Sequence, residues 1–159
     1  MNLGTCGGFD DAKVQDVVLA DKTVIYDLYE AMGDAAETIA DYSTALDVTR
    51  WPKRLDAKVH RATVVSADRD LVPAELPALA AKYRASYGDW ESGAIAYVAA
   101  HNKVPLYILR SVTDVVSATE NPSAGNLELW QRATVTAMAQ LVALLADALP
   151  DLTGAPSEK

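Results

Sequence analysis

Residues 89–114 read DWESGAIAYVAAHNKVPLYILRSVTD, and this stretch decides the class of fold. The run at 94–100 consists of small, mostly apolar residues, which predicts a helix that is buried all round. The run at 104–112 is almost continuously apolar, as expected of a strand in the middle of a covered sheet. A buried helix followed by a buried strand indicates a layered α/β domain.

Strands and helices alternate on both sides of this stretch. Further segments rich in β-branched residues predict strands at 14–20, 22–26 and 57–67. Apolar residues at helical spacing predict helices at 28–42, 73–87 and 126–149. The last helix should stop at Pro150, because proline lacks an N–H and clashes with the preceding turn. The glycine-rich segment Gly4–Gly8 is expected to form a turn.

Length and charge limit the possible classes of protein. We expect a single domain over 1–150 with a flexible tail over 151–159, since 159 residues suffice for one substantial core. A formal net charge of -8 argues against a nucleic-acid partner, because neutralising phosphates requires clustered Lys and Arg. Polar residues interrupt the apolar run at 133–149, so no membrane-spanning helix is expected.

Cysteine and histidine usage bears on the compartment and on cofactors. Cys6 is the single cysteine and cannot form an intramolecular disulfide, and no signal peptide is visible, so we expect a cytoplasmic protein. His60 and His101 have no second His or Cys nearby, so no metal site is expected. Gly4–Gly8 lacks the Lys-Ser/Thr of a phosphate-binding loop and gives only weak support for a phosphate cradle, so no cofactor is expected.

Two carboxylates are candidates for chemistry. Asp114 directly follows the predicted central strand, and ligands of open α/β sheets bind beyond the carboxyl ends of the strands. A carboxyl group beside apolar residues retains its proton more readily, so Asp114 could act as a proton donor, or it could simply form a turn or a cap. Glu91 could bind a ligand or only complement the dipole of the helix that it opens. Asp68 and Asp70 could form a third wall or lie in a solvated turn.

Three segments follow one another along the chain: NLGTCGGF (2–9) with VQDVVL (14–19), SAD (66–68), and the stretch 89–114. In this order and at these spacings they resemble the 5'-methylthioadenosine/S-adenosylhomocysteine nucleosidases of the purine nucleoside phosphorylase and nucleosidase superfamily. The resemblance covers 2–149. It implies a three-layer sandwich in which helices flank a central mixed sheet.

The resemblance also implies a function and roles for residues. The expected reaction is cleavage of the N-glycosidic bond of a purine nucleoside, such as 5'-methylthioadenosine or S-adenosylhomocysteine. Asp114 would protonate N7 of the purine, and Glu91 would hold the ribose hydroxyls. The other residues expected to bind substrate are Trp90, Asp70, Leu71 and Thr113. A homodimer is expected, because family members usually associate.

This sequence departs from the family pattern in three ways. Trp90 stands where the family commonly has Met, and Ala67 replaces a Gly. The family has a long N-terminal portion before its glycine-rich turn, which carries the Glu that activates the attacking water, whereas this chain resembles the C-terminal part only. Three hypotheses therefore stay open: an enzyme, a non-catalytic nucleoside-binding module, or a truncated form that needs a further segment or a partner. Whether water or phosphate attacks is also left open.

Overall fold

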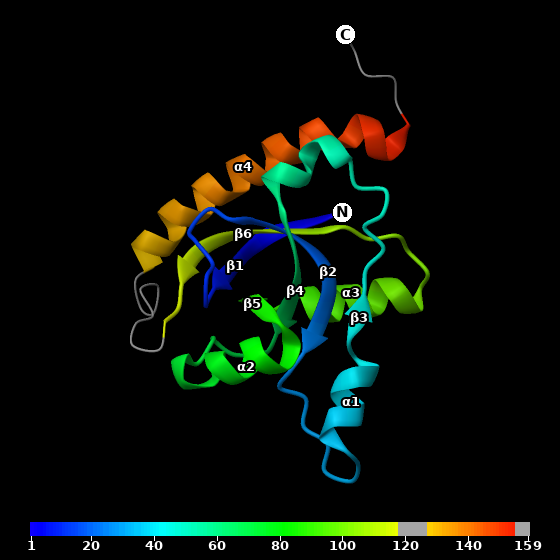
Figure 1. Cartoon of the computed structure of the whole chain (residues 1–159), viewed down its shortest axis with the longest axis vertical. Helices are drawn as coiled ribbons and strands as arrows, with labels where there is room; N and C mark the ends of the chain where they lie inside the picture. Colours follow the sequence, from blue (N-terminus) through cyan, green and yellow to red (C-terminus); the bar gives the residue numbers. More distant parts are fainter. Residues whose placement is uncertain (118–126, 155–159) are drawn as a thin grey trace.

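The computed structural model describes residues 1–117 and 127–154 of the chain (Figure 1). The strands are β1 (Asn2–Gly8), β2 (Val17–Ile25), β3 (Thr44–Ala45), β4 (His60–Ser66), β5 (Ala85–Asp89) and β6 (Ile108–Val115). The α-helices are α1 (Ala35–Asp41), α2 (Leu76–Tyr83), α3 (Ser92–His101) and α4 (Leu127–Thr153), with 3-10 helices η1 (Lys53–Lys58) and η2 (Pro73–Glu75).

The strands form one mixed sheet in the order β3-β2-β4-β5-β1-β6. Strand β2 also pairs antiparallel with β6, through Val17–Ser111 and Leu19–Leu109, so the sheet curls into a closed circuit of β2, β4, β5, β1 and β6. Strands β2, β4 and β5 are parallel, and so are β1 and β6. Closure gives each strand of the circuit a partner on both sides, which removes the free edges of an open sheet.

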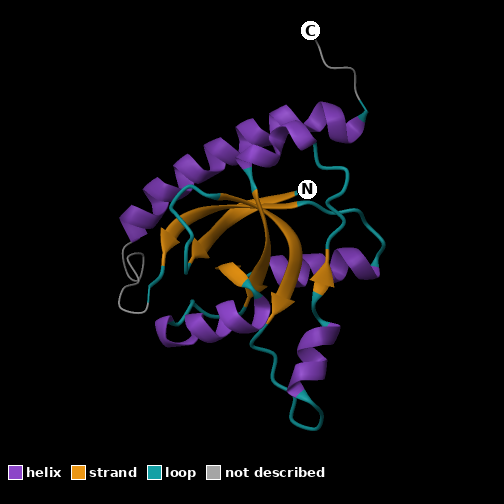
Figure 2. Ribbon diagram, viewed as in Figure 1, coloured by secondary structure: helices purple, strands orange, loops and turns teal. Residues whose placement is uncertain are grey.

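Helices flank this sheet on both sides (Figures 1 and 2). Helix α4 runs across one side against β6 and β1, while α3 and α2 lie on the other side against β2, β4 and β5. Leu141, Leu144 and Ala148 of α4 pack with Val17 and Leu109 of the sheet. The predicted α/β architecture, a mixed sheet flanked by helices, is confirmed.

Three predicted elements at the sheet are wrong. Gly4–Gly8 is part of strand β1 rather than a turn, because its backbone pairs in parallel register with β6. The strands predicted at 14–20 and 22–26 are one strand, β2, with a register shift between Ala20 and Lys22. The helix predicted at 73–87 ends at Tyr83, because Arg84 adopts a left-handed conformation with φ of 52°, and strand β5 follows.

Two predicted helix properties are also wrong. Helix α3 is not buried all round, since Val98 on its outer side is 58% exposed. Helix α4 continues through Pro150 to Thr153, so 151–153 are helical, while 155–159 lie outside the described residues. Contacts from η1 hold this last turn: Arg54 Nε donates to the carboxylate of Asp151 at 3.0 Å, and Arg54 also donates to the Asp147 carbonyl.

Contrary to the expectation for 133–149, α4 is long and apolar enough to cross a membrane by length and composition alone. A single helix of this kind is weak support for a membrane span, because the core helix of a soluble domain can meet the same test. Its inner stripe, which includes Leu141 and Leu144, packs on the sheet, whereas Val135 and Val142 of its outer side are exposed.

Candidate active site

The predicted site residues lie around one row of backbone that crosses three strands. Gly88 of β5 pairs with Gly7 of β1, and Gly7 pairs with Asp114 of β6. Neighbouring strands lie about 4.8 Å apart, so Asp114 is roughly 10 Å from Gly88 across the sheet. Strand β5 ends one residue later, and Trp90 and Glu91 then lead into α3. The two carboxylates singled out from the sequence therefore lie on either side of the glycine-rich strand β1.

A bulge sets the orientation of Asp114. The register between β1 and β6 shifts after Cys6, which pairs with Val112, so that the next residue, Gly7, pairs with Asp114 and Thr113 is the extra residue. Bulges redirect side chains next to functional sites. The Thr113 hydroxyl donates to Asp114 Oδ1 at 2.8 Å and lies 3.4 Å from the Cys6 carbonyl, which fixes the carboxylate at the half-buried end of β6.

Glu91 and Trp90 are open to solvent. Glu91 occupies the N-cap position of α3 but its side chain makes no capping hydrogen bond. Within residues 1–117 and 127–154, its carboxylate has no hydrogen bond or ion pair. The Trp90 side chain is 58% exposed beside it. Both side chains are thus available to a ligand.

Leu71 covers the glycine row from the loop after β4. A Cβ added to Gly7 would lie 3.0 Å from one Leu71 methyl group, and a Cβ added to Gly88 would lie 2.8 Å from the other. Only glycines let an apolar side chain approach the backbone this closely. Asp70, the neighbouring predicted residue, is exposed in the same loop. The structure therefore brings Leu71 to the row that ends at Asp114 and leaves the Asp70 side chain in solvent.

A buried ion pair, absent from the candidates identified by sequence, lies next to this row. Arg110 Nε donates to Asp89 Oδ2 at 2.6 Å, and both side chains are 2% exposed. The guanidinium lies against Gly4, where an added Cβ would be 3.2 Å from Arg110 Nη1. Ser66 Oγ at the end of β4 also donates to Asp89, at 2.7 Å. Together with Ser66, the pair thus links β4, β5 and β6 through side chains.

Cys6 lies inside this array of charges. Burial raises the pKa of the Cys6 thiol well above its ordinary value, and the Asp89 carboxylate raises it further. The thiol therefore stays protonated and is not a nucleophile at neutral pH. Among the described residues, no group of three His, Cys, Asp or Glu side chains is placed to hold a metal ion. His60 lies 3.5 Å from Asp16, and His101 contacts the Tyr97 carbonyl at 3.1 Å.

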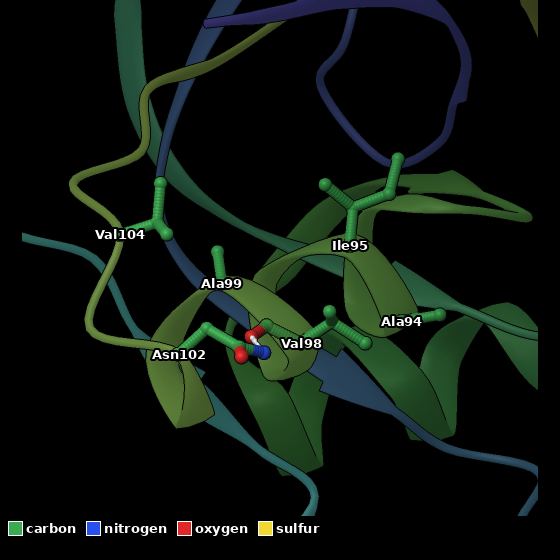
Figure 3. Close-up of a pocket in the computed structure, with 6 residues that line it drawn as sticks. All are labelled: Ala94, Ile95, Val98, Ala99, Asn102 and Val104. Carbon is green, nitrogen blue, oxygen red and sulfur yellow. Dashed lines mark hydrogen bonds between the residues drawn. The ribbon is translucent and has the colours of Figure 1, made fainter.

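A separate groove runs along the outer side of α3 (Figure 3). It has a volume of about 690 Å³ and is lined by Ala94, Ile95, Val98, Ala99, Asn102 and Val104. Its one polar side chain is already engaged, because Asn102 Nδ2 donates to the Val98 carbonyl at 2.8 Å. The groove offers no charged group for a nucleoside, and none of the predicted site residues lines it.

Comparison with known proteins identifies the family of this chain. A family model described as the phosphorylase superfamily matches residues 1–149. The chain belongs to the phosphorylase superfamily. A 5'-methylthioadenosine nucleosidase of Arabidopsis thaliana is 29% identical over 147 residues, which cover 87% of this chain and 51% of that protein. The chain therefore spans about half the length of this relative.

Solved structures show the same superfamily fold. The apo form of an Arabidopsis thaliana 5'-methylthioadenosine nucleosidase matches with a TM-score of 0.72 at 22% identity, covering 99% of this chain and 62% of that one. An MTA/SAH nucleosidase matches with a TM-score of 0.77 at 23% identity, covering 96% of this chain and 61% of that one. At these identities the likeness concerns the fold.

Asp89 and Arg110, which lie beside the candidate site, are not among the residues predicted from the sequence. In the sequence, Asp89 only begins the stretch 89–114, and Arg110 lies within the apolar run at 104–112. One signal was available: Arg110 is a charged residue inside a strand that is otherwise buried, and such a charge requires a partner. Its partner follows from the fold, because β5 and β6 are both neighbours of β1.

Proposed function

We propose that this chain binds a purine nucleoside, such as 5'-methylthioadenosine or S-adenosylhomocysteine, and cleaves its N-glycosidic bond. The observation that carries the proposal is the row Gly88–Gly7–Asp114, with a Glu91 side chain at the adjacent start of α3 that has no polar partner among the described residues. Leu71, which packs on both glycines of this row, offers the base an apolar side chain to pack against. The superfamily membership and the named relatives support the same chemistry.

In this proposal the two carboxylates act on opposite ends of the nucleoside. Asp114, oriented by the Thr113 hydroxyl, delivers a proton to N7 of the purine, which makes the base a better leaving group. Glu91 accepts hydrogen bonds from the ribose hydroxyls and favours the positive charge that develops on the sugar. Trp90 supplies an aromatic surface beside the sugar and base.

The attacking nucleophile is the open part of the reaction. We assign no residue of the described chain to activate it, and the chain spans 51% of its curated relative. Two nucleophiles could receive the ribose, and each defines an activity. With water the protein is a nucleosidase, and with phosphate it is a phosphorylase. The names of the relatives favour water.

Release of free adenine from 5'-methylthioadenosine tests this function. The purified chain is incubated with the nucleoside with and without phosphate, and adenine is quantified by chromatography. Equal release in both conditions is the expected result. Release only with phosphate would make the chain a phosphorylase. Nucleoside binding without any release would show a non-catalytic binding module, and absence of both binding and release would overturn the proposal.

We also propose that two copies of the chain associate through the groove of α3. Superfamily members of this type usually associate, and the groove presents apolar side chains such as Val98 and Val104 to solvent. Val98→Glu should shift the chain from dimer to monomer in size-exclusion chromatography with light scattering. Val142→Glu is the matched control, because Val142 is 55% exposed on the outer side of α4. A monomeric wild-type chain would contradict the dimer.

A cytoplasmic location is proposed as well. It is supported by the single cysteine, Cys6, whose buried thiol forms no disulfide. Cell fractionation tests it, and recovery of the chain in the membrane fraction would contradict it and direct attention to the apolar helix α4.

A further inference from the structure

The carboxylate of Asp89 collects hydrogen bonds from three parts of the fold. It accepts from Ser66 Oγ of β4 at 2.7 Å, from Arg110 Nε of β6 at 2.6 Å, and from both the backbone N–H and the hydroxyl of Ser92 at the start of α3. Ser66 Oγ in turn accepts from the Gly93 N–H at 2.9 Å. Asp89 and Ser66 therefore satisfy the first free N–H groups of α3, which its N-cap residue leaves unbonded.

The bond between Asp89 and Ser92 encloses two residues. Ser92 N donates to Asp89 Oδ1 at 3.1 Å, so Trp90 and Glu91 form the short loop between donor and acceptor. Neither side chain of this loop has a hydrogen bond of its own within the described residues. The position of the Glu91 backbone is therefore fixed by its neighbour Asp89, while the Glu91 carboxylate stays free.

We propose that Asp89 is a positioning residue for recognition of the ribose. It holds Glu91 where the ribose hydroxyls bind, and Arg110 and Ser66 hold Asp89. This inference rests on the proposed function, in which Glu91 contacts the sugar. Asp89 acts through Glu91, because its own carboxylate is 2% exposed and fully engaged with protein donors.

Stability alone is a poor explanation for this pair. Removing two charges from water costs about as much as their attraction returns, so buried ion pairs add little net stability compared with apolar residues of similar size. A carboxylate with four donors does impose a single geometry on the backbone around it. That geometry is imposed at the loop that carries Trp90 and Glu91.

Comparing the affinity for a nucleoside with the affinity for its free base distinguishes a positioning role of Asp89 from a general effect on stability. Adenine has no ribose, so its binding does not depend on Glu91. Asp89→Asn leaves Arg110 without its charged partner and replaces one acceptor oxygen by an NH2 donor, which releases the loop. We expect affinity for 5'-methylthioadenosine to fall by roughly tenfold, as for loss of a hydrogen bond to a charged group. Affinity for adenine should change by less than about twofold.

Isothermal titration with both ligands tests this, with thermal unfolding recorded for each variant. Asp147→Asn is the matched control, because it removes the exposed ion pair with Lys58 by the same chemical change. Equal losses for adenine and nucleoside, or no loss for either, would overturn the positioning role. A wild-type chain that binds neither ligand would instead overturn the proposed function.

Ser66→Ala serves if Asp89→Asn does not fold. It keeps the ion pair and removes the hydroxyl that links Asp89 Oδ1 to the Gly93 N–H. A selective loss of nucleoside affinity of about threefold is expected, smaller than for Asp89→Asn, since Arg110 and Ser92 still hold the Asp89 carboxylate. An unchanged ratio of the nucleoside and adenine affinities in this variant would contradict the proposal.

Discussion

Gly93 lies where α3 packs closely against the sheet. A Cβ at this position would clash with Ile25 Cγ1 and would lie 3.2 Å from Ser66 Cβ. Gly93→Ala should therefore lower the free energy of unfolding by about 1–3 kcal/mol, through overpacking. Urea unfolding measures this change. Gly33→Ala is the control, since the added methyl of this exposed residue would meet only the flexible side chain of Glu30, and a loss as large there would contradict the packing argument.

At the residue scale, the sequence predicted the exposed members of the site better than the buried ones. Glu91, Trp90 and Asp114 lie in motifs whose order and spacing resemble a family, and the fold places them around β1. Asp89 and Arg110 are 21 residues apart and meet only because of the strand order. A tertiary contact of this kind has no local pattern in the sequence.

At the element scale, contacts with the rest of the fold determined the ends of helices. Helix α4 continues beyond Pro150 with Arg54 bonded to Asp151 and to the Asp147 carbonyl. Arg54→Ala should increase hydrogen exchange in the segment 147–153, with a loss of stability of about 1 kcal/mol or less because the side chain is exposed. Arg132→Ala removes a comparable exposed pair with Glu128, and it should leave exchange at 147–153 unchanged.

Local conformation explains the elements that the sequence did not predict. Strand β5 directly follows a left-handed Arg84, and residue types give no sign of that φ angle. Strand β2 continues through the irregularity at Asp21 because β4 pairs with it both before and after that point. The long apolar runs were more informative, since burial against helices is what makes them apolar, and β6 and the inner stripe of α4 match that expectation.

At the scale of the whole molecule, curling of the sheet buries Tyr87, and this makes stability depend on pH. Burial, and then the nearby Asp16 carboxylate, raises the pKa of Tyr87 to about 12. The folded state therefore keeps the phenol proton more tightly than the unfolded state, and the stabilisation is fully present below pH 10 and is lost as the pH rises from 10 towards 12.

Tyr87→Phe should flatten the loss of stability above pH 10, because the raised pKa belongs to this phenol. Urea unfolding across that pH range measures the slope. Tyr29→Phe should leave the slope unchanged, since Tyr29 is 89% exposed. An equal effect of both substitutions would show that the slope does not come from Tyr87.

The overall architecture was predictable only in outline. Alternating apolar strands and helices indicate a layered α/β domain, and the resemblance supplies the mixed sheet. The closure of β2 onto β6 depends on long-range pairing, and local sequence does not encode it. The exposed outer side of α4 and the groove of α3 were likewise missed, because apolar residues there resemble core residues in the sequence.

Adenine release by the wild-type chain and by Asp114→Asn, measured together with the Kd for 5'-methylthioadenosine, tests the central claim most directly. The proton from Asp114 is needed mainly in the transition state, so turnover should fall by about 100-fold or more. The Kd should change by less than about fivefold. Parallel losses of turnover and affinity would make Asp114 a ground-state contact, and a wild-type chain that releases no adenine would contradict the proposed reaction.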